Sequence, residues 1–200
     1  MFNIKKFDET NSTNSLMKEN INSVNSKDVY IAAKHSGGRG RLGHTFDSPV
    51  GGHYMSVFFD AVYAPDEMPF VTVIAGICVR RALKDVCGLN TKIKWPNDIY
   101  INGRKICGIL TELVTLPQKT GVIIGIGLNV LSSDLLPDVA TSVLIETGKE
   151  YEIKLIRDKI LYYLDLLYGK CDKHKIADEL RDNILKQSDE MDKWLSFYNL

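Results

Sequence analysis

The sequence has few cysteines, and their spacing excludes the arrangements in which cysteine usually builds structure. Four are spread along 200 residues, without a CxxC pair and without a neighbouring histidine in a zinc-ligand pattern. They are Cys78, Cys87, Cys107 and Cys171. Isolated thiols of this kind are typical of reduced, packed cysteines, not of a disulfide scaffold or a zinc site. We expect none of them to have a catalytic role.

The sequence also lacks net charge and long apolar runs. Lys plus Arg equals Asp plus Glu at 25 each, so the formal net charge at pH 7 is zero. This balance gives no reason to expect nonspecific binding to nucleic acid or to an acidic membrane, and any anion site must be built locally. No apolar run could span a bilayer, and residues 1–6 lack the apolar stretch of a signal peptide. We therefore expect a cytoplasmic protein without a membrane partner.

The hydrophobic pattern predicts an α+β protein with a real core, since 44% of the residues are apolar. Strands are expected at residues 2–7, 29–33, 53–59, 92–95, 99–101, 105–114 and 121–130, and helices at 15–21, 65–88, from 152 and at 176–184. Asn102-Gly103 is a strong hairpin signal. Strand and helix do not alternate regularly enough for a doubly wound fold. We predict a mixed, largely antiparallel sheet with packed helices in a single domain, 1–200, whose C-terminal segment from about residue 152 is helical.

A glycine–arginine loop, Gly37-Gly38-Arg39-Gly40-Arg41, follows the strand expected at 29–33 and is the first candidate anion site. Arg39 and Arg41 lie two residues apart, so in an extended segment they point the same way. The glycines let the backbone approach a ligand closely, and two guanidiniums facing one way suit a carboxylate and a phosphate together. The segment matches neither a P-loop nor GxGxxG, and taken alone it is equally compatible with a mobile, solvated loop.

A second polar cluster surrounds a proline in Lys94-Trp95-Pro96-Asn97-Asp98. Pro96 is expected to break the sheet ladder, which would leave Asn97 and Asp98 at a strand end where a nucleotide or metal could meet them. Lys105 opens the next strand, where it could stabilise charge between a carboxylate and an α-phosphate. On spacing alone, a structural role for Asp98 and Lys105 is an equal alternative.

Gly125-Ile126-Gly127-Leu128-Asn129 is the third candidate segment. Glycines inside an otherwise β-rich run indicate close backbone approach by a ligand or by another chain. A β-bulge followed by a turn-forming Asn129 explains the same residues and is the preferred interpretation of this segment in isolation.

Together and in this order, these segments resemble the catalytic domain of the biotin–protein ligases. The matching residues are Ser12-Thr13-Asn14, Gly38 to Gly43, Ser48-Pro49, Tyr54-Met55-Ser56, Lys94 to Asp98, Lys105 with Gly108-Ile109-Leu110, Gly125 to Asn129 and, more weakly, Ala140 to Val143 and Glu146-Thr147-Gly148. The resemblance implies a biotin/lipoate ligase-like (class II synthetase-like) fold. It also implies a biotin–[acetyl-CoA-carboxylase] ligase, which uses ATP and magnesium to make biotinyl-5′-AMP and then passes biotin to a lysine of a biotin carboxyl carrier protein.

The resemblance also implies roles for residues of this chain. Biotin would be bound by Ser12, Thr13, Asn14, His35, Arg39, Gly40, Arg41 and Lys105, and the nucleotide by Arg41, Phe46, Asn97, Asp98 and Asn129. Lys105 and Arg41 would be the catalytic residues, and Asp98 would contact magnesium. Catalysis would then rest on positioning and charge stabilisation, without a covalent enzyme nucleophile.

Three residues and both chain ends depart from the family's pattern. His35 stands where Gln is usual, and an imidazole cannot reproduce a primary amide, so acid affinity or selectivity could be altered. His44 replaces a common Arg, and Phe46 replaces a frequent Trp but keeps a ring for adenine stacking. No helix-turn-helix precedes Phe2, so no DNA partner is expected, and the chain stops about where a C-terminal β-barrel domain usually begins. The family analogy also allows a homodimer through an exposed sheet edge.

Two other functions stay open at this level. A lipoate or octanoate ligase or transferase shares the fold, although such ligases tend to carry a different glycine-rich motif and to lack Lys-Trp-Pro-Asn-Asp. The second is a non-catalytic protein that holds biotin or its adenylate as a sensor, which His35 and the apparent lack of a C-terminal domain would suit. Formation of an acyl-adenylate from ATP and each acid would separate the three functions.

Overall fold

The computed structural model describes residues 1–38, 50–60, 65–132, 136–168, 173–186 and 189–197. Within these ranges, seven strands form one sheet in the order β1-β2-β3-β7-β6-β5-β4. They are β1 (Asn3–Thr10), β2 (Asp28–His35), β3 (Gly52–Asp60), β4 (Lys92–Lys94), β5 (Asp98–Ile101), β6 (Arg104–Leu116) and β7 (Lys119–Asn129). β1 and β2 run parallel and the other neighbours antiparallel. The prediction of a mixed, largely antiparallel sheet is confirmed.

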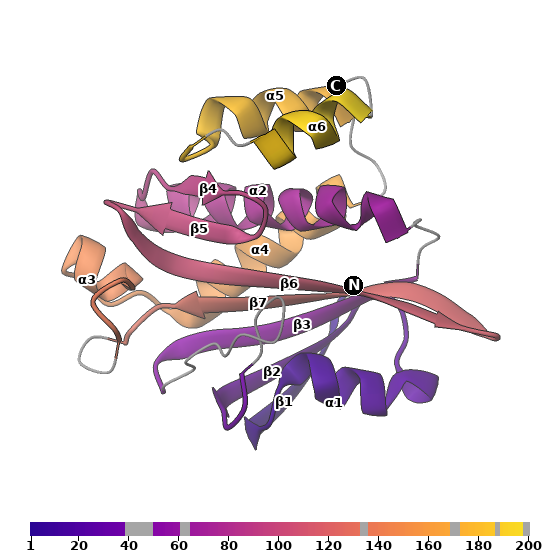
Figure 1. The fold of residues 1–200 in the computed structure, drawn as a ribbon. Helices are drawn as coiled ribbons and strands as arrows, with labels where there is room; N and C mark the ends of the chain where they lie inside the picture. Colours follow the sequence, from indigo (N-terminus) through magenta and orange to yellow (C-terminus); the bar gives the residue numbers. More distant parts are fainter. Residues whose placement is uncertain (39–49, 61–64, 133–135, 169–172, 187–188, 198–200) are drawn as a thin grey trace.

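Helices cover both faces of this sheet (Figure 1). They are α1 (Thr13–Glu19), α2 (Met68–Cys87), α3 (Val143–Thr147), α4 (Ile153–Leu167), α5 (Lys173–Asn183) and α6 (Asp189–Phe197), with short 3₁₀ turns η1 (Ile21–Ser23) and η3 (Pro65–Glu67). α2 and α4 pack on one face, α1 lies on the other, and α5 and α6 lie outside α2. In the described part of the chain, none of the helices has the length and apolarity needed to cross a membrane.

Alternation along β3 separates two hydrophobic cores. Met55 and Val57 belong to the larger core, which α2 and α4 cover, whereas Phe58 belongs to a smaller core beneath α1. Successive side chains of a strand point to opposite faces, so Tyr54 and Ser56 share the α1 face with Phe58. That face carries the candidate site.

The hairpin predicted at Asn102-Gly103 is confirmed. Asn102 and Gly103 have positive φ values of 50° and 78°, as a two-residue hairpin with a type I′ turn requires, and they join β5 to β6. Pro96 lies in the turn where the chain leaves β4 and enters β5, and it follows a cis peptide bond from Trp95. The hairpin therefore places Lys105 at the start of β6, opposite Tyr100 of β5.

Three local expectations were wrong. α1 begins at Thr13, two residues before the predicted start, and the Ser12 side chain makes no capping hydrogen bond. α3 and α6 were not predicted. The bulge preferred for residues 125–129 is absent from the pairing of β7, which continues in regular register with β3 on one side and β6 on the other. Two-sided pairing in the middle of the sheet holds these glycines in an ordinary strand.

Candidate active site

A pocket opens on the α1 face of the sheet, above the central strands. It encloses about 480 Å³, part of which is open to solvent. Its lining consists of Ser12, Thr13, Asn14, His35, Gly38, Tyr54, Met55, Asn97, Lys105, Gly108, Ile109, Leu110, Gly125, Ile126 and Gly127. The predicted site residues Ser12, Thr13, Asn14, His35, Asn97 and Lys105 are all among them. The fold thus brings together residues from α1, β2, the β4–β5 turn and β6.

Glycines in β6 and β7 leave part of the sheet surface under this pocket free of side chains. Gly108 lies directly opposite Gly127 in the β6–β7 ladder, so neither residue places a side chain on that strip of the sheet. Gly125 is required for a different reason, because a Cβ built on it would lie 2.3 Å from Oδ1 of Asn14. Backbone and the Asn14 side chain, not bulky residues, therefore face a ligand here.

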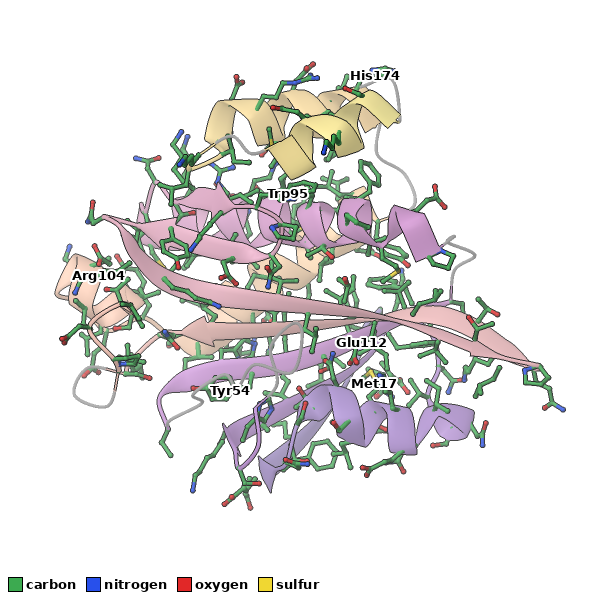
Figure 2. The ribbon with its side chains drawn as sticks, viewed as in Figure 1. Met17, Tyr54, Trp95, Arg104, Glu112 and His174 are labelled. Atoms are coloured by element: carbon green, nitrogen blue, oxygen red, sulfur yellow. The ribbon has the colours of Figure 1, made fainter. Side chains whose placement is uncertain are left out.

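At the α1 end of the pocket, the carboxamide of Asn14 is held in one orientation. Its Nδ2 donates to the Leu110 carbonyl at 3.2 Å and to Oε2 of Glu112 at 2.8 Å, while its Oδ1 accepts from the Ser56 hydroxyl at 2.5 Å. Figure 2 shows Glu112 between the sheet and α1. A carboxylate only accepts hydrogen bonds, so Glu112 selects the N–H side of the amide. The hydrogen-bonding capacity left on Asn14 is a lone pair of Oδ1, above Gly125.

His35 supplies a complementary donor at the same end. Its Nε2 accepts a hydrogen bond from the backbone N–H of Thr13 at 3.2 Å, and its ring lies 5.0 Å from that of Tyr54. Burial lowers the pKa of His35 to about 4, so the ring is neutral at pH 7. A neutral imidazole that accepts at Nε2 carries its proton on Nδ1. His35 therefore caps the start of α1 and offers the pocket one N–H donor.

Lowering the pH is expected to destabilise the protein through His35. Its pKa is about 4 when folded but near 6.5 when unfolded, so the unfolded chain binds more protons between these values. The free energy of unfolding should therefore fall as the pH decreases from about 6.5 toward 4. In His35→Gln an amide oxygen can still accept from Thr13, but the side chain does not titrate.

Urea denaturation across this pH window should show a shallower decline for His35→Gln than for the wild type. Part of the decline should persist in both proteins, because burial also lowers the pKa of His53, to about 3. Superimposable pH profiles of the two proteins would contradict a titrating role for His35.

The opposite end of the pocket carries a lysine paired with an acid. Lys105 Nζ lies 2.8 Å from Oδ1 of Asp98, and the two side chains are 27% and 19% exposed. Beside them, two hydrogen bonds attach Asn97 to β6. Its side-chain Nδ2 donates to the Ile109 carbonyl at 3.1 Å, and its backbone carbonyl accepts from the Ile109 N–H at 2.9 Å. A cation held in place next to a pocket is suited to binding a carboxylate or a phosphate.

Asn129 lies on the same face of β7 as Gly127, next to the Lys105 end. It is 3% exposed, and its Nδ2 donates to the Thr141 carbonyl at 3.0 Å. Its Oδ1 is buried and accepts no hydrogen bond from the described residues. A buried acceptor without a donor is costly in a folded protein unless a ligand or water supplies one. Asn129 is not among the residues that line the pocket, so its Oδ1 is a buried acceptor next to the pocket that a ligand group or a water could satisfy.

Several predicted residues cannot be located in this geometry. Arg39, Gly40, Arg41 and Phe46 lie outside the described residues, as does His44. For the predicted magnesium contact, the described residues contain no cluster of three His, Cys, Asp or Glu side chains that could hold a metal. Magnesium that arrives on nucleotide phosphates needs only one or two protein carboxylates, and Asp98 fits that smaller role with one oxygen held by Lys105.

Sequence reasoning did not single out the residues that orient the site. Glu112 and Ser56 fix Asn14, and the Tyr54 ring lies tilted against that of His35, yet each was passed over or quoted only as part of a motif. An acid within the apolar run of β6 was the available signal for Glu112. Cys107 agrees with its predicted structural role, because its thiol is fully buried and burial raises its pKa.

Comparison with known proteins identifies relatives of the chain. The model of the biotin/lipoate A/B protein ligase family matches residues 6–129. The bifunctional ligase/repressor BirA of Bacillus subtilis is 35% identical over 149 residues, which are 71% of this chain and 45% of BirA. The chain thus spans about half the length of the curated relatives it matches.

Solved structures agree with this assignment. A biotin protein ligase from Aquifex aeolicus, in complex with biotin and ATP, has a TM-score of 0.83 and 26% identity, with 92% of this chain and 79% of that chain covered. The Leishmania major enzyme in complex with biotin has a TM-score of 0.79 and 25% identity over 93% of this chain and 84% of its own. With more than half of its residues matched by the family model, the chain belongs to the biotin/lipoate A/B protein ligase family.

Proposed function

We propose that this protein is a biotin–protein ligase, of the biotin–[acetyl-CoA-carboxylase] ligase type. In the first step, a carboxylate oxygen of biotin attacks the α-phosphorus of ATP, and pyrophosphate leaves with the electrons of the broken P–O bond. In the second, the amine of a carrier lysine attacks the acyl carbon of biotinyl-5′-AMP, loses a proton and displaces AMP. The acceptor would be a biotin carboxyl carrier protein.

The observation that carries the choice of acid is the polarity of the α1 end of the pocket. Asn14 has only an acceptor left there, and His35 only an N–H donor. A cyclic urea such as that of biotin has an N–H to donate and a carbonyl to accept, so it satisfies both. The far ends of lipoate and octanoate have neither group, so they could use neither the remaining lone pair of Asn14 Oδ1 nor the N–H of His35.

The other end of the pocket suits the reacting groups. Lys105 would contact the biotin carboxylate and the α-phosphate and stabilise the negative charge that develops between them. Asn129 Oδ1 would accept from the nucleotide, with Asn97 and Asp98 nearby. Arg39, Gly40, Arg41 and Phe46 remain assigned to biotin and the nucleotide by the family resemblance. Magnesium would reach the site with the phosphates and neutralise part of their charge.

The relatives support this proposal by what their names state. BirA is described as a ligase and repressor, and the Aquifex protein was crystallised with both biotin and ATP. The lysine acceptor on a carrier protein is part of the proposal and rests on the family resemblance.

Incubating the protein with ATP, magnesium and one acid at a time tests the function directly. We expect biotinyl-AMP and pyrophosphate with biotin, and subsequent transfer of biotin to a purified biotin carboxyl carrier domain. Octanoyl-AMP or lipoyl-AMP in its place would overturn the choice of acid. Tight biotin binding without pyrophosphate release would instead identify a passive binder.

A further inference from the structure

A buried carboxylate outside the pocket ties three segments of the chain together. Glu146 belongs to α3, and its side chain is only 4% exposed. Its Oε1 accepts from Nη2 of Arg104 at 2.8 Å and from the Thr141 hydroxyl at 2.6 Å, and its Oε2 accepts from Nδ2 of Asn102 at 2.6 Å. Figure 2 shows Arg104 beside α3 at this end of the sheet. Glu146 thus joins α3, the β5–β6 turn and the segment around Thr141.

The backbone of Thr141 is hydrogen-bonded to two residues of the candidate site, Lys105 and Asn129. Its backbone N–H donates to the carbonyl of Lys105 at 2.8 Å. Its carbonyl accepts from Nδ2 of Asn129 at 3.0 Å. The Lys105 N–H in turn donates to the Val139 carbonyl at 2.9 Å, so residues 139–141 lie along the start of β6 like a short added strand. The position of Thr141 therefore sets which way the Asn129 amide faces.

We propose that Glu146 is a positioning residue for the nucleotide half of the site and acts through Thr141. The inference rests on the proposed function for the identity of the ligand. Glu146 is absent from the lining of the pocket, so it does not act by touching biotin there. Its effect is to hold residues 139–141 against β6, which keeps the Nδ2 of Asn129 occupied and leaves Oδ1 as the atom that meets the nucleotide.

A carboxylate is the side chain that this position requires. Three donors converge on Glu146, and a carboxylate can accept all of them. A glutamine would turn an N–H group toward at least one of these donors, and an alanine would leave all three without this partner. Release of the Thr141 hydroxyl should loosen residues 139–141, because Glu146 is its one hydrogen-bond partner among the described residues.

The matched control is Glu179, a second partly buried glutamate that joins two helices. It accepts from Nε and Nη2 of Arg81 at 3.1 and 2.5 Å and so ties α5 to α2. It contacts neither Asn129 nor Lys105. Glu179→Ala should therefore lower stability as Glu146→Ala does, without touching the candidate site.

Titration calorimetry of the full chain with ATP alone and with biotin alone tests the inference. We expect Glu146→Ala to weaken ATP binding roughly tenfold, the effect of losing one well-placed hydrogen bond, and to leave biotin binding within about twofold. Glu179→Ala should leave both affinities within about twofold, even if its melting temperature falls.

A second pair of variants covers the case in which Glu146→Ala does not fold. Thr141→Val keeps the size of the side chain but removes the hydroxyl, and Thr141→Ser keeps the hydroxyl. We expect weaker ATP binding for Thr141→Val and near-normal binding for Thr141→Ser. Two outcomes would overturn this inference but not the proposed function: an equal loss of ATP and biotin affinity in Glu146→Ala, or normal ATP binding by Thr141→Val when the wild-type protein is active. A wild-type protein that binds no ATP would overturn the proposed function as well.

Discussion

Lys105→Ala is expected to reduce biotinyl-adenylate formation by at least about a hundredfold, the loss typical of removing one group that stabilises developing charge. Lys105, at the start of β6, lines the pocket, and its ammonium group lies 2.8 Å from the carboxylate of Asp98. As the biotin carboxylate attacks the α-phosphorus, negative charge accumulates on the α-phosphate oxygens. A cation that is already in place stabilises this charge without the cost of reorganising water. The fold should survive, because the Lys105 backbone contacts with residues 139–141 do not depend on its side chain.

Pyrophosphate release with saturating biotin and ATP measures this effect. Lys94→Ala is the matched control: Lys94 lies opposite Asp98 in the β4–β5 register, but it is exposed, and its Nζ contacts the Tyr100 hydroxyl at 3.3 Å. We expect its activity to stay within about twofold of the wild type, as for most surface substitutions. Lys105→Arg keeps the charge but changes its shape, so partial activity is expected. Near-normal turnover by Lys105→Ala would show that this lysine is only structural.

Gly125→Ala is expected to disable the biotin end of the pocket. The added Cβ would lie 2.3 Å from Oδ1 and 2.9 Å from both Cγ and Nδ2 of Asn14. Asn14 cannot move aside without breaking its hydrogen bonds to Glu112 and Ser56. Overpacking of this kind costs about 1–3 kcal/mol of stability, and displacement of Asn14 should weaken biotin binding by about tenfold or more.

Chemical denaturation and biotin titration measure these two losses. Gly76→Ala is the matched control, because Gly76 is also buried, yet a Cβ there would meet Ile93 and Ile99 at an ordinary 3.5 Å. In the middle of α2, alanine should be neutral or stabilising by up to about 1 kcal/mol. In an Asn14→Ala background, where the clash is removed, Gly125→Ala should cost much less stability than it does in the wild type. Unchanged biotin affinity in Gly125→Ala would argue against Asn14 as part of the biotin site.

Much of the fold could be predicted from local patterns. β3 and α2 have apolar spacing that suits only one kind of element each, and Asn102-Gly103 has the backbone freedom that a type I′ turn demands. These features depend on residues a few positions apart, so the sequence displays them directly. The resemblance to biotin–protein ligases then named Asn14, His35 and Lys105 as site residues, and the fold does bring them to one pocket.

The start of α1 shows where local reasoning failed. Asn11-Ser12-Thr13-Asn14 is a cluster of residue types that cap helices, but the Ser12 side chain makes no capping bond, and the N–H of Thr13 donates to His35 of β2 instead. A cap supplied by another strand leaves no mark on the sequence around the helix. α3 was missed although Ser142 caps its start and Gly148 ends it, because five residues are too few to display a helical period.

By itself, the sequence determined the element types, the family and the chemical groups available for the reaction, because these follow from residue identity and short-range spacing. Only the tertiary structure decided how those groups are oriented. Glu112 is 98 positions from Asn14, yet it selects which side of the Asn14 amide faces the pocket. Glu146, through Thr141, does the same for Asn129. The polarity of an amide depends on which acceptors and donors surround it, and those neighbours exist only once distant segments have packed together.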